Sequence, residues 1–223
     1  MKMIKTSSLL SLFALCVGSF NLLAQDVKDP EAAKLLKKIK HDFDAASTME
    51  ITFDLDMTYP GEESRTQNGK LKQKGEKYHV QTDDFVIISD GKTLWFINKV
   101  NKEGQINNAG EDDGFSLFSP IELLKIYERD DHNFAITNKY TERGKSMSEI
   151  EFTPLDKMAD YFKARLKVAS ASGAISEVIF FYRDGSRLTL SIKEIAKNKA
   201  LSDDVFSFNA SKFPDVYMED LRM

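Results

Sequence analysis

The sequence predicts an α+β protein in which one long antiparallel sheet is covered by a few helices. Residues 49–59 alternate strictly between apolar and polar side chains, the pattern of a half-buried strand. Two Asp-Gly pairs, at Asp90 and Asp184, separate apolar runs in the way that tight hairpins do. Strands follow strands without βαβ alternation, so neighbours in sequence should pair. A sheet of about ten strands should curl and gain a concave face.

The first residues have the pattern of a cleaved secretory signal peptide. Lys2 and Lys5 precede an apolar run over residues 9–20, and Leu22-Leu23-Ala24 offers a cleavage site. We therefore expect a signal peptide at residues 1–24 and a single domain at residues 25–223. Cys16, the one cysteine of the chain, lies inside the expected signal, so disulfides, thiolate chemistry and cysteine-bound metals are not expected in the mature protein.

The charge balance bears on the partners of the mature protein. Removal of Lys2 and Lys5 leaves 29 Lys and Arg against 35 Asp and Glu, a net charge of −6. This argues against nucleic acid and anionic membrane surfaces as partners. No segment after the expected signal approaches the ~20 apolar residues of a membrane-spanning helix.

The mature chain should begin with an amphipathic helix followed by polar strands. Asp29 is a good N-cap and Pro30 suits the first helical position. The apolar side chains then follow helical spacing at Ala32, Leu35, Leu36, Ile39 and Phe43. After the strand at residues 49–59, further strands are expected at residues 65–73 and 77–81.

The hairpin at residues 85–97 carries more apolar side chains than an ordinary hairpin. Asp90-Gly91 favours a type I′ turn, with positive φ at both central residues. Neighbouring positions in both strands are apolar, so both faces of the hairpin need cover. One face can pack on the core; the other needs a helix, another sheet or an apolar ligand. A turn is expected next at residues 102–104.

A second helix should begin at Ser119, because Ser119 and Glu122 form a capping box. The loop expected before this helix carries an apolar tip, formed by Phe115, Leu117 and Phe118, and further strands are expected after the helix. The helix should bury Ile121, Leu123, Leu124 and Tyr127; the strands are expected at residues 132–137, 148–153, 162–168, 175–182, 187–192 and 205–208, with Phe162, Ala164, Leu166 and Val168 on one face.

Residues 86–96, from Val86 through the Asp90-Gly91 turn to Phe96, resemble the signature hairpin of the LolA family of periplasmic lipoprotein carriers. Other pieces are similar to that family in the same order along almost the whole mature chain. They are the N-terminal helix, Gly69-Lys70-Leu71, the Ser119 helix start, Phe152-Thr153-Pro154, Arg183-Asp184-Gly185, Phe206-x-Phe208 and Pro214-Asp215-Val216.

The resemblance implies a half-open antiparallel β-barrel of ten to eleven strands, with helices closing its concave apolar face over lipoprotein acyl chains. It implies a monomeric periplasmic carrier without a cofactor. Its partners would be acylated lipoproteins, an inner-membrane LolCDE-type ATP-driven exporter and, where one exists, an outer-membrane acceptor. A phospholipid shuttle and an RseB-like periplasmic sensor of lipids or lipoproteins are the alternatives.

The resemblance makes a set of apolar side chains, named below, candidates for binding lipid. The alternative interpretation is that these side chains form an ordinary hydrophobic core. The family holds its lid shut with an arginine, followed by proline, just after the Gly-x-Leu strand; here Lys74 is the candidate latch, although a lysine lacks the planar fork of arginine. The expected cavity residues are Ile51, Phe53, Leu55, Trp95, Ile97, Leu123 and Leu124, and the expected movable rim is Phe115, Leu117 and Phe118.

Catalytic motifs are missing from the sequence. His41, His79 and His132 are scattered without metal-ligand spacing, and there is no Gly-x-Ser-x-Gly elbow. Gly91-Lys92-Thr93 matches the end of a phosphate-binding loop, but Val86 stands where the first glycine is needed. We therefore expect a binding protein, neither an enzyme nor a metalloprotein.

Overall fold

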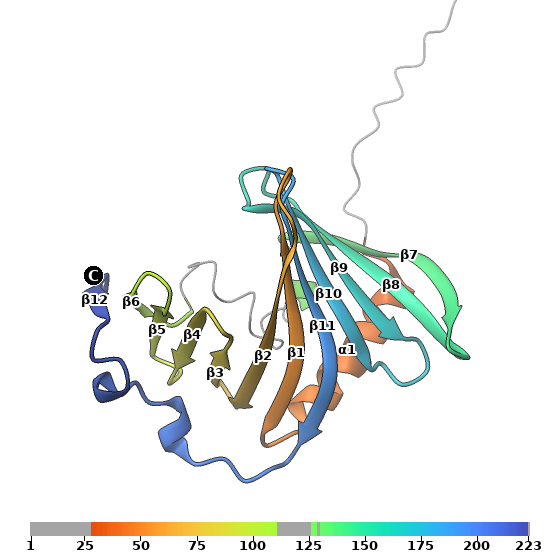
Figure 1. Cartoon of the computed structure of the whole chain (residues 1–223). Helices are drawn as coiled ribbons and strands as arrows, with labels where there is room; N and C mark the ends of the chain where they lie inside the picture. The colour runs from red at the N-terminus through yellow and green to blue at the C-terminus, as the bar shows by residue number, and fades with distance from the viewer. Residues whose placement is uncertain (1–27, 111–125, 129, 223) are drawn as a thin grey trace, which may run out of the picture.

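A computed structural model describes residues 28–110, 126–128 and 130–222 (Figure 1). Its strands form a single open sheet in the order β12-β6-β5-β4-β3-β2-β1-β11-β10-β9-β8-β7. The elements are α1 (Pro30–Asp44), β1 (Met49–Thr58), β2 (Arg65–Lys74), β3 (Lys77–Gln81), β4 (Phe85–Ser89), β5 (Thr93–Asn98), β6 (Glu103–Asn108), η2 (Ile126–Glu128), β7 (His132–Glu142), β8 (Lys145–Pro154), β9 (Tyr161–Ala169), β10 (Ile175–Tyr182), β11 (Arg187–Lys197), η3 (Asp203–Phe206), η4 (Ala210–Lys212) and β12 (Tyr217–Asp220).

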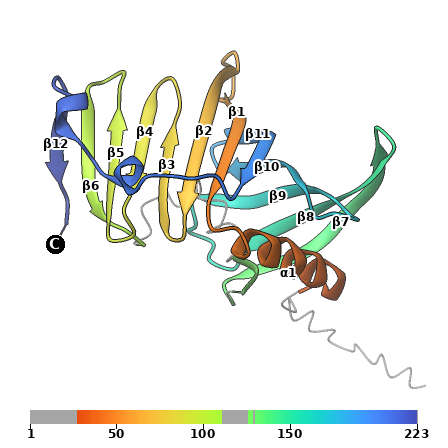
Figure 2. The same ribbon diagram turned by 90° about the horizontal axis from the view of Figure 1, so that it is seen from below.

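The predicted fold class is confirmed. The described strands number twelve, slightly more than expected, and every pairing between them is antiparallel except that of β12 with β6. The sheet curves strongly and does not close, because β12 and β7 are its two edges (Figure 1). Helix α1 lies against one face of the half made by β1 and β11 to β7 (Figure 2). We call this the inner face.

Helix α1 begins at the predicted cap and is tied there to the edge of the sheet. One carboxylate oxygen of Asp29 accepts from the backbone N–H groups of Glu31 and Ala32, and the other accepts from the N–H of Ile136 in β7 at 3.0 Å. The hydrogen bond from Ile136 is the main cause that lowers the pKa of the Asp29 carboxyl. One side chain therefore fixes both the start of the helix and its position on β7.

No helix in the described residues is long and apolar enough to cross a membrane.

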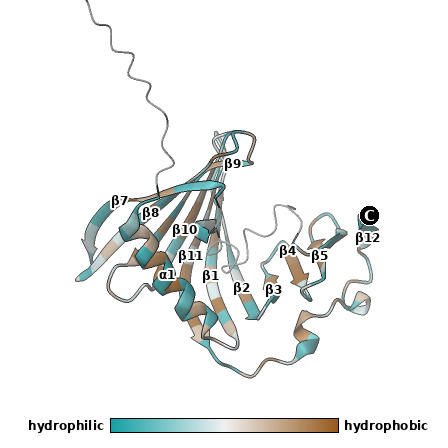
Figure 3. Cartoon of the chain, turned by 180° about the vertical axis from the view of Figure 1, so that it is seen from behind, coloured by the Kyte–Doolittle hydropathy of each residue, from teal (hydrophilic) through white to brown (hydrophobic). Residues whose placement is uncertain are grey.

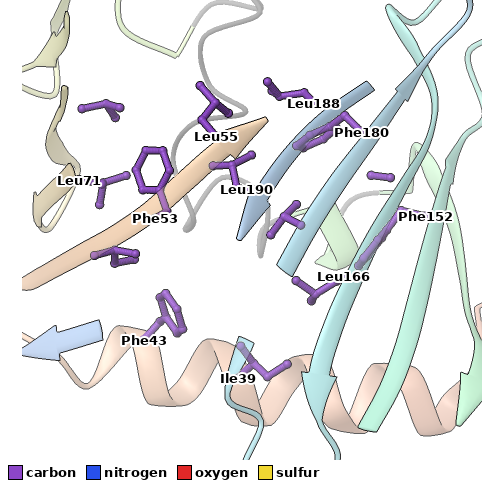
Figure 4. Close-up of a cluster of buried hydrophobic side chains, with 14 of the residues drawn as sticks. Ile39, Phe43, Phe53, Leu55, Leu71, Phe152, Leu166, Phe180, Leu188 and Leu190 are labelled. Carbon is purple, nitrogen blue, oxygen red and sulfur yellow. The ribbon is translucent and has the colours of Figure 1, made fainter. Parts of the chain in front are cut away.

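The inner face carries one continuous apolar cluster. It joins the buried side of α1 to alternate residues of β1 to β5 and β7 to β11. Figure 4 shows Ile39 and Phe43 of α1 facing side chains that project from several strands, among them Leu166. Apolar and polar residues alternate along these strands (Figure 3). The cluster therefore follows from the period-2 patterns of the sequence.

Three local expectations are wrong. Phe162 does not share a face with Ala164, because a bulge in the pairing of β9 with β10 places Tyr161 inside and leaves Phe162 42% exposed. No strand forms at residues 205–208: the first two residues end the 3₁₀ helix η3, the next two belong to no helix or strand, and the last strand is β12. The residues expected to turn at 102–104 include the first two residues of β6.

The turn of the central hairpin also differs from type I′. Gly91 has φ of +89°, but Asp90 is not in the left-handed region. The Asp90 carboxylate accepts from the N–H groups of Lys92 and Thr93 at 2.8 and 2.7 Å and so stabilises the turn. The predicted helix at Ser119 and the signal peptide at residues 1–24 lie outside the described residues.

The chain after β11 lies on the outer face of the sheet, opposite the cluster with α1. In Figure 2 it crosses the strands between β1 and β6 before it reaches β12 at the edge. It contacts β3, where Nδ1 of His79 donates to the carbonyl oxygen of Val205 at 2.9 Å. It then covers a second apolar cluster, formed by Val86, Ile88, Trp95 and Ile97 with Phe208, Phe213, Val216 and Met218.

Candidate functional site: the inner apolar face under α1

The centre of the inner face is built by β1. Ile51, Phe53 and Leu55 are at most 3% exposed and belong to the cluster that includes α1. They share a face because side chains alternate along a strand, and the bulge between Thr52 and Phe53 in the pairing with β11 does not disturb this. The structure thus brings together three of the expected cavity residues.

Phe53 lies directly over Gly69, its partner in β2. A Cβ atom added at Gly69 would meet the far edge of the Phe53 ring well inside van der Waals contact. The glycine therefore makes room for the ring on the inner face. Figure 4 shows the Phe53 ring beside Leu71, which like Gly69 belongs to β2.

Helix α1 closes part of this face and is held there by weak attachments besides its apolar side. Glu31 pairs with Lys139 of β7 at 2.6 Å, and Asp42 pairs with Lys197 of β11 at 2.8 Å. Lys197 holds the pKa of the Asp42 carboxyl below its usual value. Exposed ion pairs of this kind contribute about 0–1 kcal/mol each. The helix is therefore held mainly by its buried apolar side chains, among them Leu36 and Ile39.

The structure does not bring Trp95 and Ile97 to the inner face. Both belong to the outer cluster, under the C-terminal segment, whereas Leu94 and Phe96 of the same strand belong to the inner cluster, which also includes residues of α1 and β1. The expectation of one cavity containing Trp95, Ile97 and the β1 residues therefore placed β5 in the wrong register by one residue. Leu94 and Phe96 are the inner-face residues that the sequence analysis missed; their apolar character alone could not have distinguished them from their neighbours.

Several expected site residues cannot be compared with the structure. Leu123 and Leu124, and the rim residues Phe115, Leu117 and Phe118, lie outside the described residues. Their roles stay predictions.

Lys74 contacts the C-terminal segment. Its ammonium lies 3.1 Å from a carboxylate oxygen of Asp203 in η3, which Lys77 also approaches at 3.5 Å. These lysines lower the pKa of the Asp203 carboxyl. The observed ion pair joins β2 to η3 on the outer face, and it leaves the role of Lys74 as a lid latch a prediction.

Two polar features are the alternative candidates for a site. A hollow of about 800 Å³ is lined mostly by polar residues of β1, β2 and the β3–β4 turn, with the Asp54–Lys193 ion pair at 2.5 Å. At the start of β7, buried His132 bonds to Tyr161 at 2.8 Å. Within the described ranges, no three His, Cys, Asp or Glu side chains gather as metal ligands would. Neither feature therefore brings together a set of metal ligands among the described residues.

The described residues thus combine an open, curved antiparallel sheet with a helix on its apolar inner face. The chain belongs to the family described as outer membrane lipoprotein carrier protein LolA, whose profile matches residues 44–209. The resemblance found in the sequence is thereby confirmed. The matched part contains β1 to β11 and ends before η4 and β12.

Solved structures and one curated protein are similar to this chain. An uncharacterized conserved protein from Thermus thermophilus has a TM-score of 0.54 at 7% identity, over 86% of this chain and 99% of that one. A putative outer membrane lipoprotein-sorting protein domain from Vibrio parahaemolyticus has a TM-score of 0.46 at 15% identity, over 82% and 99%. An uncharacterized protein of Methanocaldococcus jannaschii is 28% identical over 126 residues. That match covers 53% of this chain and 37% of the relative, so it spans well under half of the relative's length.

Proposed function

We propose that the mature protein is a periplasmic carrier that holds the acyl chains of lipoproteins on its inner face and shuttles them from the inner to the outer membrane. The observation that carries this proposal is the apolar cluster that runs without interruption from α1 across β1 to β5 and β7 to β11. Membership of the LolA family supports the same chemistry. On this proposal the inner-face side chains of β1, together with Leu94 and Phe96, contact the acyl chains.

The energetics require that the site bind lipid only moderately. A triacylated lipoprotein offers on the order of 40 methylenes at ~0.8 kcal/mol each, or ~30 kcal/mol for transfer from water, beyond the ~20 kcal/mol ceiling of non-covalent affinity. The useful comparison is therefore between the bilayer and the protein. Acyl chains gain little by moving from one apolar environment to another, so extraction from the membrane needs external work.

The external work is assigned to an inner-membrane LolCDE-type ATP-driven exporter. The phosphate-loop-like stretch Gly91-Lys92-Thr93 cannot supply a nucleotide site, because the N–H groups of Lys92 and Thr93 already bond to the Asp90 carboxylate. An outer-membrane acceptor is the corresponding partner for delivery where the organism has one. Helix α1 is the described element that covers part of the inner face; on this proposal it moves to admit acyl chains to that part, and its weak polar attachments suit that role.

Native mass spectrometry of the protein isolated from the periplasm of its own cells tests the proposal. We expect a complex with acylated polypeptide that dissociates when the acyl chains are removed enzymatically. Free phospholipid in place of acylated polypeptide would support a phospholipid shuttle. Protein that carries neither, and that also fails to take up a purified lipoprotein released from vesicles by the exporter, would contradict a carrier role and favour the sensor alternative.

A further inference from the structure

Gln73 places a polar side chain on the otherwise apolar inner face. It is 2% exposed, and it shares its side of β2 with Leu71 because the two are separated by one residue. Its direct neighbours across the sheet are Met49 of β1 and Tyr78 of β3. Gln73 is also the second-last residue of β2. Its amide therefore lies near one end of the inner face.

The amide of Gln73 has one satisfied end and one unsatisfied end. Its Nε2 donates to the carbonyl oxygen of Gly75 at 3.1 Å, while its buried Oε1 has no hydrogen-bond partner. A carbonyl oxygen only accepts, so the donor end of the amide must face Gly75 and the orientation cannot be reversed. Oε1 is therefore an acceptor fixed in a buried position.

Two comparisons within the described residues set this atom apart. The other buried side-chain atom without a hydrogen bond is Oε1 of Glu177, and that carboxylate forms an ion pair with Lys167 at 2.6 Å. Gln67, which is also 2% exposed and on the same side of β2, uses both ends of its amide. Its Nε2 donates to Asp84 at 2.9 Å and its Oε1 accepts from the backbone N–H of Asp84 at 3.2 Å.

A buried acceptor without a donor destabilises the protein, so a native structure normally provides a donor from the chain, from water or from a ligand. The surroundings of Gln73 favour an uncharged donor, since the neighbouring Met49 and Leu71 would not compensate the desolvation of an ammonium group. The position near the end of β2 suits the polar end of a ligand whose chains lie along the apolar face. An ester offers only acceptors there, whereas an amide-linked acyl chain offers an N–H.

We propose that Oε1 of Gln73 accepts a hydrogen bond from an uncharged donor at the polar end of the bound lipid, the N–H of an amide-linked acyl chain. This rests on the proposed function and adds a selectivity to it. A lipid hydroxyl presents the same donor chemistry. The carrier would thereby prefer N-acylated cargo over lipids in which every chain is ester-linked.

The test compares an N-acyl amide with the ester of the same chain length, using the full mature protein and titration calorimetry. We expect wild-type protein to bind the amide about tenfold more tightly, the value of one well-made hydrogen bond. Gln73→Met keeps the length of the side chain and removes the acceptor, so it should bind both lipids equally. Gln67→Met is the matched control and should keep the preference. A monoacylglycerol probe distinguishes an amide N–H from a lipid hydroxyl as the donor. If wild-type protein prefers monoacylglycerol to the simple ester, and Gln73→Met loses that preference, the donor is a hydroxyl.

Equal binding of amide, ester and monoacylglycerol by wild-type protein would overturn the inference and leave the carrier proposal intact. A preference that persists in Gln73→Met would also overturn it. Failure of wild-type protein to bind any of these lipids would contradict the proposed function itself. Thermal unfolding checks the variants. In Gln73→Met the removal of the unsatisfied acceptor should offset the loss of the Nε2 hydrogen bond to Gly75, so we expect little change in Tm, and Gln73→Leu replaces it if the methionine variant does not fold.

Discussion

The indole ring of Trp95 stacks on the ring of Phe208, with centroids 5.9 Å apart and planes within 13°. Phe208 stacks in turn on Phe213, also at 5.9 Å. These contacts attach the C-terminal segment to the outer face of the β4–β5 hairpin. The second cover that this unusually apolar hairpin requires therefore comes from the same chain, about a hundred residues further on.

Trp95→Ala and Phe96→Ala should separate folding from lipid binding. Trp95→Ala should lower the free energy of unfolding by about 2–3 kcal/mol and speed proteolysis after residue 200, because it removes a half-buried aromatic contact from the C-terminal segment. It should leave acyl-chain binding intact. Phe96→Ala changes the inner face and should weaken that binding. Denaturant titration and a lipid-binding assay measure both effects; greater loss of lipid affinity in Trp95→Ala would contradict the assignment of faces.

Gly69→Ala should destabilise the protein although it adds one methyl group. The new Cβ would overlap the Phe53 ring, which is 3% exposed and has little room to move. Overpacking of this kind costs about 1–3 kcal/mol. Denaturant unfolding measures the loss. Phe53→Leu in the same chain should restore part of it, and purely additive losses in the double variant would show that the two side chains do not clash.

Attachment of the C-terminal segment should weaken in mild acid. Burial is the main cause that lowers the pKa of the His79 imidazole below its ordinary 6.5, while its hydrogen bond to Val205 acts in the other direction. The folded pKa is depressed, so this contribution to stability is fully present above pH 6.5 and is lost as the pH falls through the folded pKa. Limited proteolysis between pH 7.5 and 5 should show faster cleavage near Val205.

His79→Asn is the control for that measurement. The amide of asparagine can donate from nearly the position of Nδ1 but does not titrate, so the acid-dependent part of the cleavage should disappear. An unchanged pH profile in His79→Asn would assign the effect to another group, such as the carboxylates whose pKa values are lowered in the folded protein.

Lys74→Ala and Lys197→Ala should loosen different elements. Lys197 contacts both a side-chain oxygen and the backbone oxygen of Asp42, near the end of α1, whereas Lys74 contacts Asp203 of η3. Hydrogen exchange should therefore rise in α1 for Lys197→Ala and around η3 for Lys74→Ala. Both effects should be small and decrease with added salt, because the pairs are exposed. Faster exchange of α1 in Lys74→Ala would support the lid-latch prediction.

Local signals were sufficient for most of the secondary structure. The Asp29-Pro30 start of α1, the alternation along β1 and the glycine turn between β4 and β5 each depend on a few adjacent residues. These elements could therefore be predicted from the local sequence. The bulge that exposes Phe162 could not be predicted in this way, because it arises from how β9 pairs with β10.

By itself the sequence determined an antiparallel, curved sheet with an amphipathic helix and an apolar face, since period-2 and period-3.6 patterns are set by backbone geometry. Only the tertiary structure decided which side of the β4–β5 hairpin faces α1. Both sides are apolar, so the choice depends on partners far away in the chain: Leu94 and Phe96 meet the inner cluster, and Trp95 and Ile97 meet the C-terminal segment. A shift of one residue exchanges the two sides, and no local pattern encodes that shift.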